Sequence, residues 1–316
     1  MLEHLAVIDL GSNSVRLAVT EIQNDGSFKN IIERKEPVRL SENMGSEKIL
    51  KKPAIERTIS TLKSFKEDFK DLENVHLKAV ATAATRMAKN QKDFLDEVME
   101  KTGIELEVIT GTTEAYYDYL GVINSLPVVN GIIMDTGGAS TELVLVQNRR
   151  AMNLISLPFG SVTLSEGRIN PDVVSAGELF RLSDYLNNIF NDIWWLSRAT
   201  NLPIIGLGGS NRTLAKIKRR RDADRKYWDD IHGFHLSNQE AKDIFLKLLN
   251  SDLADRKMIP GVSKERADII VGGLCPAMEM MKRLNSDRMI FGKQGLRYGV
   301  LYEHLNSLKS EGKISK

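Results

Sequence analysis

The chain has 316 residues, more than one hydrophobic core usually organises, so its length predicts two domains. Hydrophobic residues make up 42% and charged residues 27% of the chain, which is typical of globular proteins and excludes the disordered and fibrous classes. The formal net charge is only +2, far from the strong basicity of proteins that live on nucleic acid or anionic membranes. We therefore expect no nucleic acid and no membrane as a partner, and any polyanion must be bound locally.

The N-terminal sequence and the single cysteine bear on the location of the protein. The sequence MLEHLAVIDLGSN lacks the basic and long apolar regions of a signal peptide, and no run of about 18 apolar residues occurs in the chain. Cys275 has no partner for an intrachain disulfide and lies in an apolar stretch, so we interpret it as a small buried hydrophobe. These features predict a cytoplasmic protein.

The first predicted element is a β-hairpin. Residues 5–10 are apolar, and residues 15–22 have the composition of a strand. The turn between them consists of Gly11, Ser12, Asn13 and Ser14.

The rest of the first half alternates between predicted helices and strands. Helical spacing of apolar residues predicts an amphipathic helix over 54–72. Shorter patterns predict a strand over 75–80, a helix over 92–101, a strand over 104–109 and a helix from about 114 to 123, capped by Thr112 or Thr113. Residues 124–127 interrupt this pattern, and we place the domain boundary there.

The second half opens with a repeat of the first hairpin. An apolar strand again ends in Asp, a glycine turn carrying Ser follows, and residues 141–146 form a second strand. At a constant offset of 126 residues, Asp9, Gly11 and Ser14 correspond to Asp135, Gly137 and Ser140. Such a repeat at near-domain spacing indicates an internally duplicated architecture with one hairpin in each domain.

The remaining elements surround a glycine-rich turn. Residues 202–207 are expected as a strand that enters Gly208, Gly209 and Ser210, and a helix follows from about residue 213. Further helices are expected at 177–198, 238–249, 264–284 and 299–308, with a short strand at 289–291.

The glycine turns have the composition of phosphate-binding loops. Successive backbone N–H groups in such a turn form a concave nest for phosphate oxygens, and a helix N-terminus after a glycine turn also binds anions. An ordinary turn is the alternative for either hairpin alone, whereas the matched pair favours binding. The predicted phosphate ligands are Gly11, Ser12, Asn13, Ser14, Gly137, Gly138, Ser140 and Thr141, with Gly208, Gly209 and Ser210 at the third turn.

Arg86 and Glu114 are candidates whose roles the local sequence leaves open. Arg86 ends a run of small residues directly after a predicted strand, so it is either a phosphate clamp or a solvated Arg at a strand end. Glu114 lies in the first helical turn, where the helix dipole favours any acid, and where a general base for attacking water would also be well placed.

Three carboxylates are candidates for a metal site. Asp9 and Asp135 each precede a nest, where a carboxylate repels phosphate unless a cation lies between them, and Glu142 is a third candidate. Mg²⁺ takes one or two carboxylates together with waters and phosphate oxygens. Hydrogen bonding of these acids to turn amides is the alternative.

Residues 212–226 contain eight Lys or Arg against two Asp. A solvated charged face is the usual meaning of such a run, and a track for a polyanion is the alternative. His232 and His235 lack further ligands at metal spacing, so we interpret them as structural.

Taken together, these residues resemble the exopolyphosphatase and guanosine pentaphosphate phosphohydrolase (Ppx/GppA) family over nearly the whole chain. The segments that carry the resemblance are residues 8–17, 81–86, 111–115, 135–142, 156–160, 206–214, 265–268 and 295–297.

This resemblance implies an α/β fold of two ribonuclease-H-like domains, as in actin, Hsp70 and sugar kinases, with an interdomain cleft. The domains would cover residues 1–124 and 125–298, with residues 299–316 packing back on the first.

The family's function implies an exopolyphosphatase that releases terminal orthophosphate from inorganic polyphosphate with Mg²⁺. By position, Glu114 would act on the attacking water, Asp135 and Glu142 would organise the metal, and the two loops with Arg86 would clamp phosphate. A pppGpp 5'-phosphohydrolase, a kinase of the same superfold and a non-catalytic binder of guanosine tetraphosphate or polyphosphate are the alternatives. A homodimer is left open.

The chain departs from the family pattern at five positions. Thr112 and Thr113 replace usual acids, Ala139 a usual Gly, Thr163 a common Arg and Tyr298 a common Glu. These departures bear on turnover rate and substrate choice more than on the fold.

Overall fold

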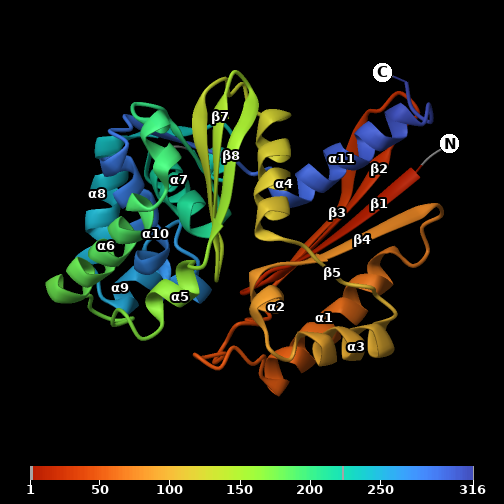
Figure 1. Cartoon of the computed structure of the whole chain (residues 1–316), viewed down its shortest axis with the longest axis horizontal. Helices are drawn as coiled ribbons and strands as arrows, with labels where there is room; N and C mark the ends of the chain where they lie inside the picture. The colour runs from red at the N-terminus through yellow and green to blue at the C-terminus, as the bar shows by residue number, and fades with distance from the viewer. Residues whose placement is uncertain (1–2, 223, 316) are drawn as a thin grey trace. The chain divides into compact units, whose positions relative to one another are not determined.

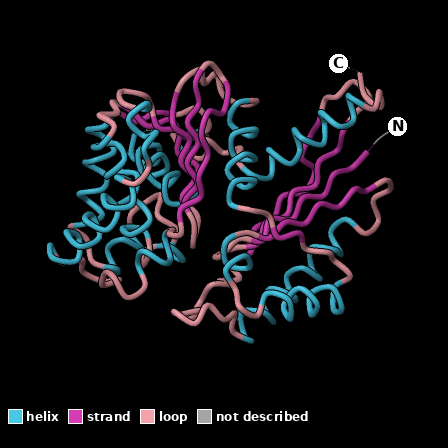
Figure 2. The backbone as a smooth tube through the Cα atoms, in the orientation of Figure 1, coloured by secondary structure: helices cyan, strands magenta, loops and turns pink. Residues whose placement is uncertain are grey.

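The computed structural model describes residues 3–222 and 224–315 (Figures 1 and 2). The chain divides into two compact units. The first unit runs to Gly121 and resumes at Leu296, whereas the second comprises Val122–Gly295. We propose that these units are the two domains of the chain, and each is described by itself.

The first unit is built on a five-stranded sheet with the order β3-β2-β1-β4-β5. β1 pairs antiparallel with β2, and β2 with β3, whereas β1 pairs parallel with β4, and β4 with β5. The strands are β1 (Glu3–Leu10), β2 (Val15–Ile22), β3 (Phe28–Glu36), β4 (Val75–Ala81) and β5 (Glu107–Val108). The helices are α1 (Lys52–Phe69), α2 (Ala83–Met87), α3 (Gln91–Thr102), α4 (Gly111–Ile123) and α11 (Leu296–Ser310).

Helices cover both faces of this sheet (Figure 1). Because side chains alternate along a strand, Ala6 and Ile8 of β1 belong to one hydrophobic cluster, which includes residues of α1 and α3. Leu5 and Val7 belong to another, which includes residues of α4 and α11. β1 is therefore the buried centre of the unit, and its run of apolar residues follows from contact on both faces.

The second unit contains a six-stranded sheet with the order β10-β11-β9-β6-β7-β8. Its strands are β6 (Gly131–Thr136), β7 (Thr141–Gln147), β8 (Arg150–Leu157), β9 (Ile204–Leu207), β10 (His235–Ser237) and β11 (Arg288–Phe291). Its α-helices are α5 (Ser161–Ser165), α6 (Ala176–Asn191), α7 (Gly208–Asp222), α8 (Asn238–Leu249), α9 (Leu253–Met258) and α10 (Ile270–Arg283). Short 3₁₀ turns span Trp194–Ala199, Arg225–Tyr227 and Lys264–Arg266.

The two sheets repeat one topology. β6, β7 and β8 form an antiparallel meander, and β9 and then β11 add in parallel beside β6, as β4 and β5 do beside β1. This order and these directions are those of a ribonuclease-H-like sheet, and β10 extends the second sheet at one edge. The predicted α/β fold and its internal duplication are confirmed.

Several predicted elements differ from those observed. The helix expected from about residue 114 begins at Gly111, and Thr110 caps it: its Oγ1 accepts a hydrogen bond from Thr113 N at 3.0 Å. Neither Thr112 nor Thr113 is the cap. The strand expected at 104–109 is shorter than predicted. Only the two residues of β5 pair with β4, so the rest of the segment is not part of the sheet. β3 and β8, which carry many polar residues, were not predicted.

Two further sequence interpretations concern single features. Cys275 is buried within α10, and burial raises the pKa of its thiol, as expected of a small hydrophobe. Among the helices of the described residues, none has the length and apolar character needed to cross a membrane.

α11 approaches α4 closely at Gly299. A Cβ atom built on Gly299 would lie 2.0 Å from the backbone oxygen of Tyr117. The Tyr117 hydroxyl donates a hydrogen bond to Glu303 at 2.7 Å, one turn further along α11. Burial of this phenol, followed by the contact with Glu303, raises its pKa. A residue without a side chain is therefore required where the two helices meet.

We expect Gly299→Ala to destabilise the first unit by about 2 kcal/mol, because a backbone atom cannot move aside as a side chain can. The steric cost must exceed the gain of up to about 1 kcal/mol in helix propensity. Urea unfolding followed by circular dichroism measures the change. Gly177→Ala in α6 is the matched control, since its Cβ would approach the Arg181 side chain only to 3.5 Å. Equal midpoints for the two variants would contradict the close approach.

Candidate functional site

The two hairpin turns have the same geometry. Gly11 N donates to Ser14 O at 3.1 Å, and Gly137 N donates to Ser140 O at 3.0 Å. A Cβ atom built on Gly11 would lie 3.2 Å from Ser14 O, and one built on Gly137 would lie 3.2 Å from Ser140 O. The sequence repeat is thus a structural repeat down to single hydrogen bonds.

Each turn is held from outside through its carbonyl groups. Ser12 O accepts a hydrogen bond from Ser41 N at 3.0 Å, and Asn13 O accepts one from Arg39 N at 3.0 Å. In the second unit, the N–H groups of Ser161 and Val162 donate to the oxygens of Gly137 and Gly138, at 2.9 and 2.8 Å. With the carbonyl groups fixed in this way, the peptide planes of both turns are immobilised.

Apart from those of Gly11 and Gly137, N–H groups of the turns remain available. Within the described parts of the chain, the backbone N–H groups of Ser12, Asn13 and Gly138 donate no hydrogen bond. Ser12, Ser14 and Ser140 are nevertheless buried. Fixed, unbonded N–H groups beside buried hydroxyls are what a phosphate nest requires.

The structure brings Arg86 and Glu114 together, which the sequence did not predict. Arg86 lies on α2, and Glu114 lies in the first turn of α4. Arg86 Nη1 donates to Glu114 Oε2 at 3.2 Å and to Ile109 O at 2.9 Å. The side chains are 25% and 12% exposed, respectively. The guanidinium therefore holds the carboxylate in one orientation, as a general base needs.

Asp9 lies among cations of its own unit. Asp9 and Arg16 are directly opposite each other in β1 and β2, so their side chains share a face of the sheet. Arg297, in the first turn of α11, donates to Leu17 O at 3.3 Å. Burial lowers the pKa of Arg297, as does the charge of Arg16, whereas the charge of Asp9 raises it. Arg297 is a site residue that sequence reasoning quoted only within a motif.

Asp135 and Glu142 form the corresponding pair of the second unit. They are directly opposite each other in β6 and β7 and therefore point to the same face. Glu142 is 2% exposed, and its Oε1 accepts a hydrogen bond from Ser156 Oγ at 2.7 Å. Two carboxylates on one face, Glu142 buried and Asp135 half-buried, favour a cation nearby.

The third glycine turn lies against Asp135. Gly208 has φ +78°, and a Cβ atom there would lie 2.5 Å from Asp135 Oδ1. Only glycine combines this conformation with so close an approach. Gly208 also begins α7, so the N-terminus of this helix lies beside Asp135, and its role as an anion site stays a prediction.

Arg266 covers the same helix N-terminus. A Cβ atom on Gly209 would lie 1.2 Å from Arg266 Nη1, so the guanidinium packs directly on the glycine backbone. Ser210 beside it is 1% exposed. Arg266 adds a fixed positive charge to the turn, and sequence reasoning singled it out only as part of a matching segment.

Asp135 and Glu142 fit a magnesium ion, which needs only one or two protein carboxylates. The described residues contain no group of three His, Cys, Asp or Glu side chains able to hold a metal, so the remaining ligands would be water and substrate oxygens. Asp9 as a third ligand stays a prediction.

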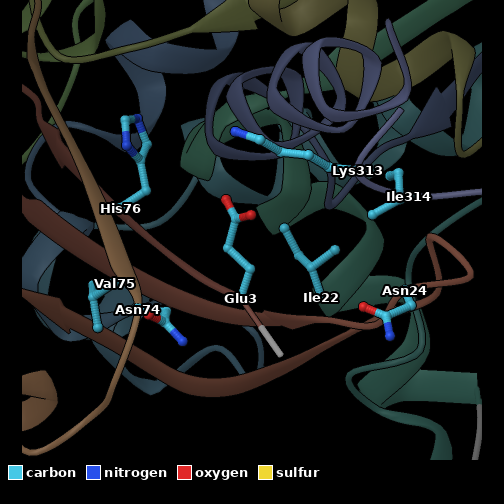
Figure 3. A pocket seen from close by; sticks show the side chains of 8 residues that line it. All are labelled: Glu3, Ile22, Asn24, Asn74, Val75, His76, Lys313 and Ile314. Carbon is cyan, nitrogen blue, oxygen red and sulfur yellow. The ribbon is translucent and has the colours of Figure 1, made fainter. Parts of the chain in front are cut away.

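A cavity of about 520 Å³ lies at the other end of the first sheet. Figure 3 shows Glu3, at the start of β1, and Ile22, at the end of β2, among its lining residues. The Gly11 turn follows the opposite end of β1, about 25 Å away at the usual rise of a strand. This cavity is therefore separate from the predicted phosphate-binding residues.

Comparison with known proteins gives the family context. Residues 18–308 match the sequence model of the Ppx/GppA phosphatase family. A bifunctional 3-dehydroquinate synthase/phosphatase of Fusobacterium nucleatum is 29% identical over 94% of this chain and 46% of its own length. A guanosine-5'-triphosphate,3'-diphosphate pyrophosphatase of Vibrio vulnificus is 28% identical over 97% of this chain and 60% of its own. The chain thus spans about half the length of these curated relatives.

Solved structures of similar proteins match this chain over almost the full length of both proteins. A Ppx/GppA family member of Aquifex aeolicus is 31% identical, covers 97% of this chain and 99% of its own, and has a TM-score of 0.81. An exopolyphosphatase of Cytophaga hutchinsonii, 24% identical with coverages of 96% and 98%, has a TM-score of 0.87 and shares the fold. With its matching segments, its duplicated sheets and a family match over most of its length, the chain belongs to the Ppx/GppA phosphatase family.

Proposed function

We propose that this protein is an exopolyphosphatase, a hydrolase that releases terminal orthophosphate from inorganic polyphosphate. The observation that carries the proposal is the pair of matched hairpin turns with immobilised, unbonded N–H groups, together with the Arg86–Glu114 pair. Ppx/GppA phosphatases act on phosphoanhydride bonds, which agrees with this chemistry. We propose the cytoplasm as its location, and a homodimer stays an untested prediction.

The first unit supplies phosphate donors and the base. The N–H groups of Ser12 and Asn13 bind phosphate oxygens, and Arg86 adds charge-assisted donors. Glu114 accepts a proton from the attacking water as the water oxygen bonds to the terminal phosphorus. The phosphoanhydride bond to that phosphorus breaks at the same time, and the shortened polyphosphate leaves with the bridging oxygen. Because Arg86 contacts the same carboxylate, it fixes the base while remaining close enough to neutralise phosphate charge.

The second unit has its own predicted phosphate donors and the predicted metal ligands. Gly138 N–H and the Ser140 hydroxyl repeat the donors of the first nest, whereas Gly137 N–H is bonded to Ser140 O and the Thr141 hydroxyl donates to Phe159 O at 2.8 Å. The α7 N-terminus with Arg266 provides another anion site. Asp135 and Glu142 would hold Mg²⁺, which when bound neutralises charge on phosphate oxygens. The Glu142–Ser156 hydrogen bond orients one of these carboxylates.

Three of the five departures from the family pattern have local structural roles. Thr163 Oγ1 accepts a hydrogen bond from Gly160 N at 2.8 Å, next to the second turn. The Tyr298 hydroxyl accepts one from Asn30 Nδ2 at 2.9 Å. The Thr113 hydroxyl is hydrogen-bonded to the hydroxyl of the capping residue Thr110 at 2.8 Å. These side chains are built into the fold, which supports a working site with altered substrate choice.

A pppGpp 5'-phosphohydrolase is the second candidate. The name of the Vibrio vulnificus relative favours it, as a protein that acts on a guanosine nucleotide. The same nests and base would serve both substrates, because both end in a phosphoanhydride. A non-catalytic binder of guanosine tetraphosphate or polyphosphate is the outcome if binding occurs without turnover.

Glu114→Gln is expected to lower kcat for phosphate release by about 10²- to 10⁴-fold, because it removes a positioned base. Polyphosphate binding should persist, since the phosphate donors act in both ground and transition states. Phosphate release and calorimetric binding measure the two effects. Glu105→Gln, an exposed acid in the segment before β5, is the matched control. Full activity of the Glu114 variant would leave it as a helix-end acid.

Removal of divalent cations should abolish activity, and Mg²⁺ should restore it. Asp135→Asn and Glu142→Gln should each raise the Mg²⁺ concentration needed for half-maximal activity by at least about tenfold, because each removes an anionic ligand. Asp9→Asn decides the status of the third carboxylate: a similar shift would make it a ligand, and an unchanged requirement would leave it as a partner of Arg297. Asp96→Asn on α3 serves as the control.

At equal concentration, polyphosphate should be hydrolysed with a higher kcat/KM than pppGpp, and ATP with the lowest. The reason is that the features argued for the site are donors to phosphate oxygens, and none of them recognises the guanine of a nucleotide. A phosphate-release assay with the three substrates tests the order. Faster turnover of pppGpp would favour the second candidate function.

A further inference from the structure

The basic run of α7 divides into two faces with different surroundings. On one face, Lys218 forms ion pairs with Asp222 and with Glu240 of α8, both at 2.7 Å. Arg221 pairs with Asp222 at 2.6 Å. The charges of this face are balanced within the fold. Lys218 and Arg221 therefore form a solvated charged face, which is the usual meaning of a basic run such as residues 212–226.

The other face carries Arg212, Lys216 and Arg220, which are spaced four residues apart and so lie in a row. Lys216 and Arg220 form no ion pair with any carboxylate in the described residues 3–222 and 224–315. The Arg220 Nε–H is buried and has no hydrogen-bond partner among those residues. The Arg220 guanidinium lies over the Trp228 ring at 5.5 Å, a contact that adds no negative charge. Like charges four residues apart disfavour a helix, so the row keeps an unbalanced positive charge.

Lys216 lies at the centre of a local positive field. Burial lowers its pKa, and the charge of Arg212 lowers it further. Arg220 and Arg266 act in the same direction, and Asp229 opposes them. Arg266 packs on Gly209 at the start of α7, so the row continues from the anion site at this helix N-terminus. The row spans about 12 Å along the helix, at 1.5 Å per residue.

We propose that Arg212, Lys216 and Arg220 form a binding track for the distal phosphates of a long inorganic polyphosphate chain. The inference rests on the proposed function, and it assigns chain-length preference to this face of α7. A flexible polyanion with a charge on each phosphate matches a linear row of cations. A short substrate would occupy the glycine turns alone and leave the row empty.

The test compares two double variants on the same helix. K216Q/R220Q removes two charges from the track, and K218Q/R221Q removes two from the paired face. For the first variant, we expect KM for long-chain polyphosphate to rise about tenfold, while KM for tripolyphosphate and kcat for both substrates stay within about twofold. The binding constant for long-chain polyphosphate should also become less sensitive to salt. By analogy with proteins that bind nucleic acids, the slope of its logarithm against the logarithm of the salt concentration should fall by about one to two. The K218Q/R221Q variant should resemble the parent protein.

Four outcomes would overturn the proposal. Equal changes in KM for long and short substrates, no change for either, or equal effects of the two double variants would make the row a solvated charged face. Calorimetric binding of long-chain polyphosphate to the full chain separates this result from failure of the proposed function. If the parent protein releases no phosphate, loss of binding in K216Q/R220Q still supports the track. Equally tight binding of a single-stranded RNA, lost in the same variant, would make the row a nucleic-acid surface and contradict it.

Discussion

The parallel pairing of strands β1, β4 and β5 is the constraint on which the rest of the first unit depends. Parallel strands end at the same edge of a sheet, so the segments that follow them must meet there. The Gly11 turn follows β1, α2 with Arg86 follows β4, and α4 with Glu114 follows β5. Residues more than a hundred positions apart in the chain are thereby brought to one edge.

The second unit obeys the same constraint with different residues. The Gly137 turn follows β6, and Gly208 with α7 follows β9, the parallel neighbour of β6. Here the edge carries two carboxylates and a helix N-terminus, whereas the first unit places an Arg–Glu pair there. The duplication therefore repeats the scaffold and the turns, while the side chains around them have diverged.

Electrostatics explains why arginines accompany each predicted anion site. A nest of neutral N–H groups binds phosphate through dipoles, and a fixed guanidinium adds a full charge without a flexible stem. Arg86, Arg266 and Arg297 each contact the backbone or an acid of their own unit. Their positions are set by the fold before any ligand arrives, which lowers the entropic cost of binding.

Local sequence was sufficient for the hairpins, the glycine turns and the repeat, because strand composition and turn residues act over a few positions. It also placed α8 at Asn238–Leu249, where the capping serine and the helical spacing agree.

Local sequence missed β3 and β8, whose polar composition is compatible with a strand only beside an already formed neighbour. It did not pair Arg86 with Glu114 or place Arg266 on Gly209, because both contacts join segments far apart in the chain. Likewise, the basic run was visible in the sequence, but only the tertiary structure separated its paired face from the row at Lys216, since the balancing charge of Glu240 comes from another helix.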